Sequence, residues 1–189
     1  MKLYYFDARN LAEPTRMCLA YGGVHYEDVR IKPGDDWVNN YKPKMPHGKV
    51  PVLEVDGKYL CESAAICRFV ARKHGLVGKT EWEQAKVDEL INVQKDFYKE
   101  LAPYFYSKAG FNEPEKVDQY YEEVAKPVLK KYLTMYTELL EKNGSGFFVG
   151  QHESFADFWI SDYLFTLNGL VPELAKDYPK LVGAYQKSS

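Results

Sequence analysis

The first part of the chain alternates short apolar runs with segments of helical periodicity. Residues 3–6 form an apolar run of strand length, and a second strand is predicted over residues 26–31. Between them, Glu13-Pro14 opens an apolar pattern of helical spacing that stops at Gly22-Gly23, as expected for a helix with proline in its first turn and glycine past its end. Because a helix separates the two strands, we expect them to be parallel.

A β-hairpin and a helix are predicted to follow. The apolar runs 51–55 and 58–61 flank Asp56-Gly57, a dipeptide that favours the type I′ turn. Residues 62–73 have their apolar side chains on one helical face, and this helix ends near His74-Gly75. The hairpin would add antiparallel strands to the same sheet. The predicted order is therefore β-α-β, an irregular segment, and β-β-α.

After residue 79 the pattern is helical throughout. Long helices are predicted over residues 81–101 and 115–140, and Pro127 should kink or interrupt the second. Ser154 and Asp157 fit a capping box at the start of a helix that runs through Leu167. We therefore predict an α/β domain of residues 1–76, a linker near 74–79, and an all-helical domain of residues 80–189.

Composition and charge indicate a soluble globular protein. The chain is 46% apolar and 28% charged, and its net charge of −2 does not suggest a nucleic-acid partner or an anionic membrane. No apolar run has the length of a membrane helix, and the N-terminus lacks a signal-peptide core. Cys18, Cys61 and Cys67 show no CxxC spacing, which indicates reduced thiols in the cytoplasm. The histidines show no metal-ligand spacing, so no metal is expected.

Two patterns together describe a binding site for a peptide. A cis bond before Pro51 would turn the backbone of Val50 outward, where an extended peptide could pair with it, although local sequence favours an ordinary trans proline. Ser63 at a helix start could bind a carboxylate together with the free N–H groups there, or it could simply cap the helix. In combination, the two patterns fit an extended peptide that carries a carboxylate.

The end of the first strand offers a phenol that could stabilise a thiolate. Strand alternation places Tyr4 and Tyr5 on opposite faces, so at most one lies in a site, and both could be core aromatics. Lowering the pKa of a thiol from about 8.5 by about two units requires about 2.7 kcal/mol of preferential thiolate stabilisation. One charge-assisted hydrogen bond and a helix dipole are of this size. No cysteine lies in the turn after this strand, so disulfide exchange through a protein thiol is not expected.

These motifs resemble those of cytosolic glutathione S-transferases, in particular the sigma-like group that includes nematode enzymes. The resemblance implies a thioredoxin-like N-terminal domain followed by an all-helical domain, and a homodimer. It also implies a cytoplasmic enzyme that conjugates glutathione, its co-substrate, to small hydrophobic electrophiles in detoxification. The segments that carry the resemblance are 2–6, 12–13, 26–30, 48–57, 62–66, 82–88, 96–97, 148–150 and 154–157.

The resemblance assigns roles to single residues. It implies that Tyr5 stabilises the thiolate while Tyr4 belongs to the core, and that the bond between Val50 and Pro51 is cis. Asp96 would reach across the dimer to the glutathione bound by the partner subunit. The other implied glutathione-binding residues are Trp37, Lys42 (or Lys44 in its place), Lys49, Glu62 and Ser63. The second-substrate pocket would be lined by Phe6, Leu11, Tyr98 and Tyr104.

Some positions depart from the family pattern. Leu11 stands where many sigma-type members have arginine, Glu62 replaces a common glutamine, and His47 replaces an aromatic residue of the dimer contact. Family members usually extend further into a last helix, which we expect to be absent here. Other functions fit the same resemblance: a prostaglandin D-type isomerase that uses glutathione, a ligandin-like binding protein, or a structural S-crystallin. The short segment 104–114 disfavours the crystallin, which typically carries an insertion there.

Overall fold

The computed structural model describes residues 1–171, 176–181 and 183. Contacts divide the chain into two compact units, Met1–Val77 and Gly78–Ser189. The division falls inside the segment that the sequence predicts as a linker. Residues 172–175, 182 and 184–189, which belong to the predicted helical domain, lie outside the described residues.

The first unit is built on a four-stranded sheet of order β2-β1-β3-β4. Its strands are β1 (Lys2–Phe6), β2 (Glu27–Ile31), β3 (Val52–Val55) and β4 (Lys58–Cys61). β1 is parallel to β2, whereas β3 is antiparallel to both β1 and β4. Asp56 and Gly57 both have positive φ, 51° and 75°, as a type I′ turn requires. The predicted parallel pair and hairpin are confirmed.

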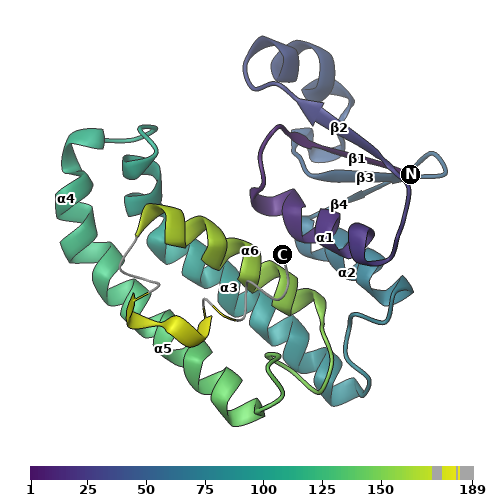
Figure 1. Ribbon diagram of the computed structural model, residues 1–189. Helices are drawn as coiled ribbons and strands as arrows, with labels where there is room; N and C mark the ends of the chain where they lie inside the picture. The colour runs from purple at the N-terminus through teal and green to yellow at the C-terminus, as the bar shows by residue number, and fades with distance from the viewer. Residues whose placement is uncertain (172–175, 182, 184–189) are drawn as a thin grey trace. The chain divides into compact units, whose positions relative to one another are not determined.

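Two helices lie next to each other along this sheet (Figure 1), α1 (Glu13–Tyr21) and α2 (Ser63–Lys73). Pro14 occupies the first turn of α1, and Gly22 follows its last residue, as predicted. The core of the unit consists of aliphatic side chains from strands and helices with no exposed surface, including Leu3, Leu19, Ile31, Leu53 and Ile66.

Alternation along β1 separates its two tyrosines. Tyr5 is buried with 5% of its surface exposed, whereas Tyr4 is only partly buried and its hydroxyl donates to Glu54 Oε2 at 2.7 Å. Burial and the adjacent Glu54 carboxylate raise the pKa of Tyr4. The expectation that Tyr4 belongs to the core is therefore wrong, because its ring lies on the less covered face of the strand.

Between β2 and β3, the chain folds into three short helical turns. These are Asp36–Tyr41, Lys42–Lys44 and Pro46–Gly48. His47 and Gly48 both adopt left-handed conformations, with φ of 59° and 56°, after which Lys49 is extended. This reversal returns the chain to the sheet just before β3.

The described helices of the second unit are α3 (Glu81–Lys108), α4 (Val117–Tyr120), α5 (Lys126–Asn143) and α6 (Phe155–Leu170). The prediction that the first of them ends at Leu101 is wrong: α3 continues through Pro103 because Tyr104 and Ser107 are buried and anchor its last turns. The predicted helix over 115–140 is interrupted by a π-helical turn, Tyr121–Ala125. Pro127 lies directly after it, in the first turn of α5.

Aromatic packing between helices forms the core of the second unit, in which α3 and α6 lie side by side (Figure 1). The ring of Phe97 stacks on Tyr132 with a centroid distance of 4.5 Å and meets Tyr163 edge-on at 5.1 Å. The predicted capping box of α6 is present, since the N–H and hydroxyl of Ser154 both donate to Asp157 Oδ2, at 2.8 and 2.7 Å. Among the described residues, no helix is long and apolar enough to span a membrane.

Candidate functional site

A small pocket of about 160 Å³ lies in the first unit, where the chain enters β3 and where α2 begins. It collects residues that are far apart in the sequence. Three segments contribute to it: the turn after β1, the loop before β3, and the junction of β4 with α2. Six of the predicted site residues line it: Leu11, Lys49, Val50, Pro51, Glu62 and Ser63.

The peptide bond between Val50 and Pro51 is cis, as the resemblance implies. Pro51 is buried just before the first residue of β3, and Val50 is half-buried in the pocket wall. The backbone of Val50 thus lies in the wall immediately before a sheet strand. An extended peptide lying in the pocket could pair with the main chain at this point.

Ser63 lines the pocket at the N-terminus of α2. The residue before it, Glu62, takes the N-cap position without a side-chain capping bond, so the alternative that Ser63 only caps the helix does not describe the structure. Helix N-termini carry free N–H groups and partial positive charge, which favour a bound carboxylate. Ser63 adds a hydroxyl to this end of the pocket.

Glu62 itself has an unusual backbone conformation, with φ of 69° and ψ of 111°. A residue other than glycine in such a region costs about 1–3 kcal/mol, and residues of this kind concentrate at functional sites. The conformation lets the chain turn from β4 directly into α2. It places an exposed carboxylate at the pocket beside Ser63.

Three further lining residues were not predicted as site residues: Pro46, His47 and Cys61. An isolated histidine in a Pro-His-Gly turn reads as a surface loop residue, so only the turn itself could be predicted. Cys61 directly precedes Glu62, and burial together with the Glu62 carboxylate raises the pKa of its thiol. Among the described residues, no group of three or more potential metal ligands is found.

The described lining of this pocket does not include Tyr5, Phe6 or Trp37, which form a row of aromatic rings. The ring of Tyr5 is tilted against Phe6 at 5.7 Å, and Phe6 meets the edge of Trp37 at 5.5 Å. Phe6, predicted for the second substrate, therefore touches a residue predicted for glutathione. Conversely, Leu11 lines the pocket together with Val50 and Ser63, so the two predicted groups are not separated in this unit.

Lysine side chains lie around the loop before β3. Lys49 lines the pocket and is exposed. Lys42 does not line it, but its side chain lies next to Gly48 in the same loop. A Cβ atom added to Gly48 would be 3.7 Å from Lys42 Cγ. Lys44 is also exposed. The loop thus gives positive charge to this side of the pocket.

The remaining predicted site residues belong to α3 in the second unit. Asp96 is exposed. Tyr98 packs against Phe105 and Tyr163 with ring centroids 5.9 Å apart in both pairs. Tyr104 is buried, and its hydroxyl donates to the carbonyl of Leu170 at 3.4 Å. Their roles toward a ligand stay predictions.

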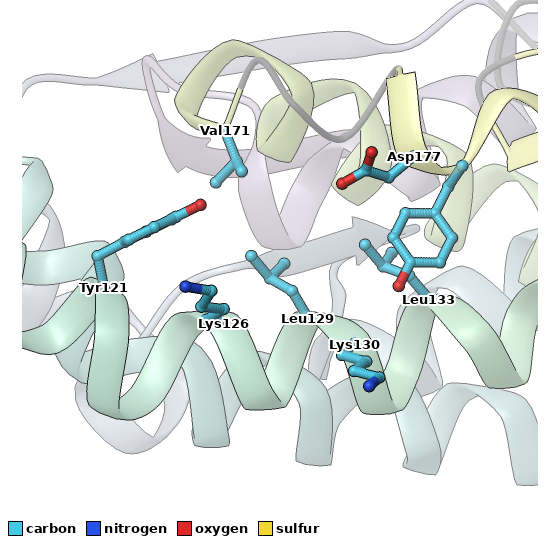
Figure 2. A pocket seen from close by; sticks show the side chains of 8 residues that line it. Tyr121, Lys126, Leu129, Lys130, Leu133, Val171 and Asp177 are labelled. Atoms are coloured by element: carbon cyan, nitrogen blue, oxygen red, sulfur yellow. The ribbon is translucent and has the colours of Figure 1, made fainter.

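A larger cavity, of about 390 Å³, lies within the second unit, and its lining contains none of the predicted site residues among those described. Figure 2 shows α5 beneath it, with Leu129 pointing toward Val171 and with Tyr121 on one side. The ammonium of Lys126 lines it as well but already donates to Glu122 at 2.8 Å. We assign no chemistry to this cavity.

Comparison with known proteins agrees with the geometry. The family model "Glutathione S-transferase, N-terminal domain" matches residues 1–72, and "Glutathione S-transferase, C-terminal domain" matches residues 95–189. Glutathione S-transferase 1 of Ascaris suum is 42% identical over 180 residues, which are 95% of this chain and 86% of that protein. The match therefore spans both structural units.

Solved structures are similar over the same extent. The glutathione S-transferase of Ascaris lumbricoides is 40% identical, with a TM-score of 0.92, over 98% of this chain and 89% of the other. Na-GST-3 from the hookworm Necator americanus, described as monomeric, is 37% identical with the same TM-score and the same coverage. With its thioredoxin-like unit, its helical unit and relatives at this level of identity, the chain belongs to the glutathione S-transferase family.

Proposed function

We propose that this chain conjugates the thiolate of glutathione to small hydrophobic electrophiles, as a cytoplasmic, sigma-like detoxification enzyme that acts as a homodimer. The observation that carries the proposal is the pocket of the first unit, which Val50, the cis Pro51 and Ser63 at the start of α2 line together. The family supplies the reaction type, and the chemistry of the pocket supplies the fit to glutathione.

Each polar group of glutathione has a proposed partner in or near the pocket. Glutathione is an extended peptide, whose cysteine backbone can pair with Val50 in the manner of an added strand. Its γ-glutamyl carboxylate suits Ser63 and the N-terminus of α2, and its ammonium suits the carboxylate of Glu62. Its glycine carboxylate suits the lysine side of the loop. There Lys49, Lys42 and Trp37 are the proposed contacts.

Tyr5 is the proposed stabiliser of the thiolate. Its phenol would donate a hydrogen bond to the sulfur, a charge-assisted bond that favours the ionised thiol. Tyr4 is not a candidate for this role, because its hydroxyl donates to Glu54 on the other face of β1. Cys18, Cys61 and Cys67 are free thiols that this mechanism does not use.

The electrophile and the partner subunit complete the proposal. Phe6, Leu11, Tyr98 and Tyr104 are proposed for the apolar second substrate on the basis of the family resemblance. Asp96, exposed on α3, is proposed to reach the glutathione of the partner subunit.

The test is conjugation of glutathione to a chromogenic aryl halide by the wild type, Tyr5→Phe and Tyr4→Phe. Tyr4→Phe is the matched control, since it removes a neighbouring phenol that is bonded to Glu54. We expect Tyr5→Phe to lose about one to two orders of magnitude in kcat, because it removes the charge-assisted hydrogen bond but leaves the helix dipole, while its glutathione affinity stays within a few-fold of the wild type. Tyr4→Phe should retain its rate.

The outcomes separate the competing functions. A wild type that binds glutathione tightly but does not conjugate it would indicate an isomerase or a binding protein, and turnover of a prostaglandin endoperoxide would distinguish these two. Equal rates for Tyr5→Phe and the wild type would remove Tyr5 from the mechanism. A chain that does not bind glutathione would contradict the proposal as a whole.

A further inference from the structure

Arg16, on α1, is a buried cation next to the proposed catalytic tyrosine. Only 6% of its surface is exposed. Its guanidinium carbon lies 5.9 Å from the centroid of the Tyr5 ring, within the range of a cation–π interaction. Such an interaction is stronger where water is excluded, and Tyr5 is itself 5% exposed.

The guanidinium is fixed by contacts to three segments of the first unit. Its Nε donates to both oxygens of Asp28 on β2, at 3.1 and 3.3 Å. Its Nη1 donates to Glu13 on α1 at 2.9 Å and to the carbonyl of Ala8 at 2.8 Å. Ala8 lies in the turn that directly follows Tyr5 and Phe6. Arg16 therefore holds the end of β1 against α1 and β2.

The neighbouring carboxylates do not fully neutralise the charge of Arg16. Asp28 also accepts from Arg30 at 2.7 Å, and Glu13 also pairs with Arg9 at 3.6 Å, so both carboxylates are shared with outer arginines. The Nη2 group of Arg16 is buried without a hydrogen-bond partner among the residues that the structure describes. A buried group of this kind calls for an explanation beyond folding. The neighbouring π-face of Tyr5 supplies one.

We propose that Arg16 is a positioning residue for Tyr5: its guanidinium orients the ring, and its charge makes the phenol a stronger hydrogen-bond donor to the thiolate of bound glutathione. The inference rests on the proposed function. A cation beside an aromatic ring stabilises electron density on that ring, which strengthens O–H donation. The guanidinium of Arg16 places positive charge beside the Tyr5 ring.

The test compares the pKa of the enzyme-bound glutathione thiol, read from thiolate absorbance, in the wild type, Arg16→Gln and Arg16→Lys. Glutamine keeps a hydrogen-bond donor without the charge, and lysine keeps the charge without the planar fork. We expect Arg16→Gln to raise the bound thiol pKa by about one unit, which lowers the thiolate fraction by about tenfold at pH values well below both pKa values. Affinity for S-methylglutathione, which has no thiol, should change less than about threefold. The bound thiol pKa of Arg16→Lys should lie between those of the wild type and Arg16→Gln.

Arg30→Gln is the matched control, because Arg30 binds the same Asp28 carboxylate from an exposed position. It should leave the thiol pKa unchanged. In a Tyr5→Phe background, Arg16→Gln should add no further shift, since Arg16 is proposed to act through Tyr5. A full, additive shift in that background would overturn the inference.

Three further outcomes are decisive. If Arg16→Gln does not fold, Arg16→Lys alone must raise the bound thiol pKa with unchanged S-methylglutathione affinity, and a wild-type thiol pKa overturns the inference. An unshifted thiol pKa in Tyr5→Phe would instead overturn the role of Tyr5, and the inference with it. A shift in Tyr5→Phe without one in Arg16→Gln would overturn the inference alone.

Discussion

At the scale of the residue, the core of the second unit accommodates polar groups by pairing them. Tyr136 has no exposed surface, and its hydroxyl donates to Oε1 of Gln94, which is 2% exposed, at 2.8 Å. Burial raises the pKa of Tyr136, so the phenol remains a neutral donor. The ring also packs against Phe97 and Phe148, with centroids 6.2 and 5.5 Å away. The Tyr136 hydroxyl thus supplies the Gln94 oxygen with a hydrogen bond where water does not reach.

Removing that hydroxyl should be costly although the ring remains. We expect Tyr136→Phe to lower the free energy of unfolding by about 1–3 kcal/mol, because the Gln94 oxygen is left buried without its donor. Urea denaturation measures the change. Tyr106→Phe is the control, since Tyr106 is 40% exposed and should change stability by less than about 0.5 kcal/mol. Equal stability of Tyr136→Phe and the wild type would show that Gln94 repacks.

Residue-level inference from the sequence succeeded where a backbone constraint limited the choice. Alternation along β1 correctly separated Tyr4 from Tyr5, but whether Tyr4 is buried depends on what covers that face of the sheet, which a single strand does not encode. The pocket contribution of His47 could not be predicted for a similar reason. Its position follows from two successive left-handed residues that redirect the loop.

At the scale of the element, α3 and α5 are joined by an ion pair and a hydrogen bond at their surface. Glu100 on α3 accepts from Lys131 Nζ at 2.9 Å and from the hydroxyl of Tyr132 at 2.7 Å, both on α5. The hydrogen bonds from Lys131 and Tyr132 lower the pKa of Glu100. The ionised form of Glu100 is thus more stable in the folded chain than in the unfolded one.

This contact predicts a pH-dependent contribution to stability. A lowered carboxyl pKa stabilises the fold above the ordinary value of about 4.3, and the contribution is lost as the pH falls through the folded value. We expect Glu100→Gln to be slightly less stable than the wild type at about pH 6, and the difference to vanish at lower pH. The effect is small because the pair is solvent-screened.

Urea midpoints across the acidic range measure this difference. Glu89→Gln is the control, because Glu89 pairs with Lys86 within the same helix, α3. A Glu100→Gln difference that grows as the pH falls would have the wrong sign and would contradict the assignment.

Elements were predictable where turn residues mark their ends. Gly23, which follows α1 with a φ of 61°, and Asp56-Gly57 between β3 and β4 fixed those boundaries, because few residues adopt a positive φ. The end of α3 was not predictable. Proline usually stops a helix, but buried Tyr104 and Ser107 beyond Pro103 favour its continuation, and that burial depends on the other helices.

At the scale of the whole molecule, the proposed site would combine groups from two chains. Asp96 is exposed on α3 in the second unit, whereas the pocket lined by Ser63 belongs to the first. If Asp96 reaches the glutathione of the partner subunit, dimerisation and glutathione binding are linked. Each ligand then stabilises the assembly, and the assembly strengthens each ligand.

That linkage can be measured by dilution. We expect the affinity for glutathione to weaken by about tenfold as the protein is diluted through its dimer dissociation range, which is followed by analytical ultracentrifugation. Asp96→Asn should show the weaker affinity at every concentration, and the neighbouring surface substitution Lys95→Gln should behave as the wild type. A monomer with undiminished affinity, as the monomeric relative allows, would contradict the role of Asp96.

The left-handed backbone of Glu62 has a consequence for how this chain could evolve or be engineered. Glycine at this position would relieve the conformational cost by about 1 kcal/mol, so selection for thermal robustness alone would favour the change. The same change would delete the carboxylate that is proposed to bind the ammonium of glutathione. A library screened only for heat resistance should therefore accumulate variants with higher thermal stability and lower affinity for glutathione, both caused by the substitution at position 62.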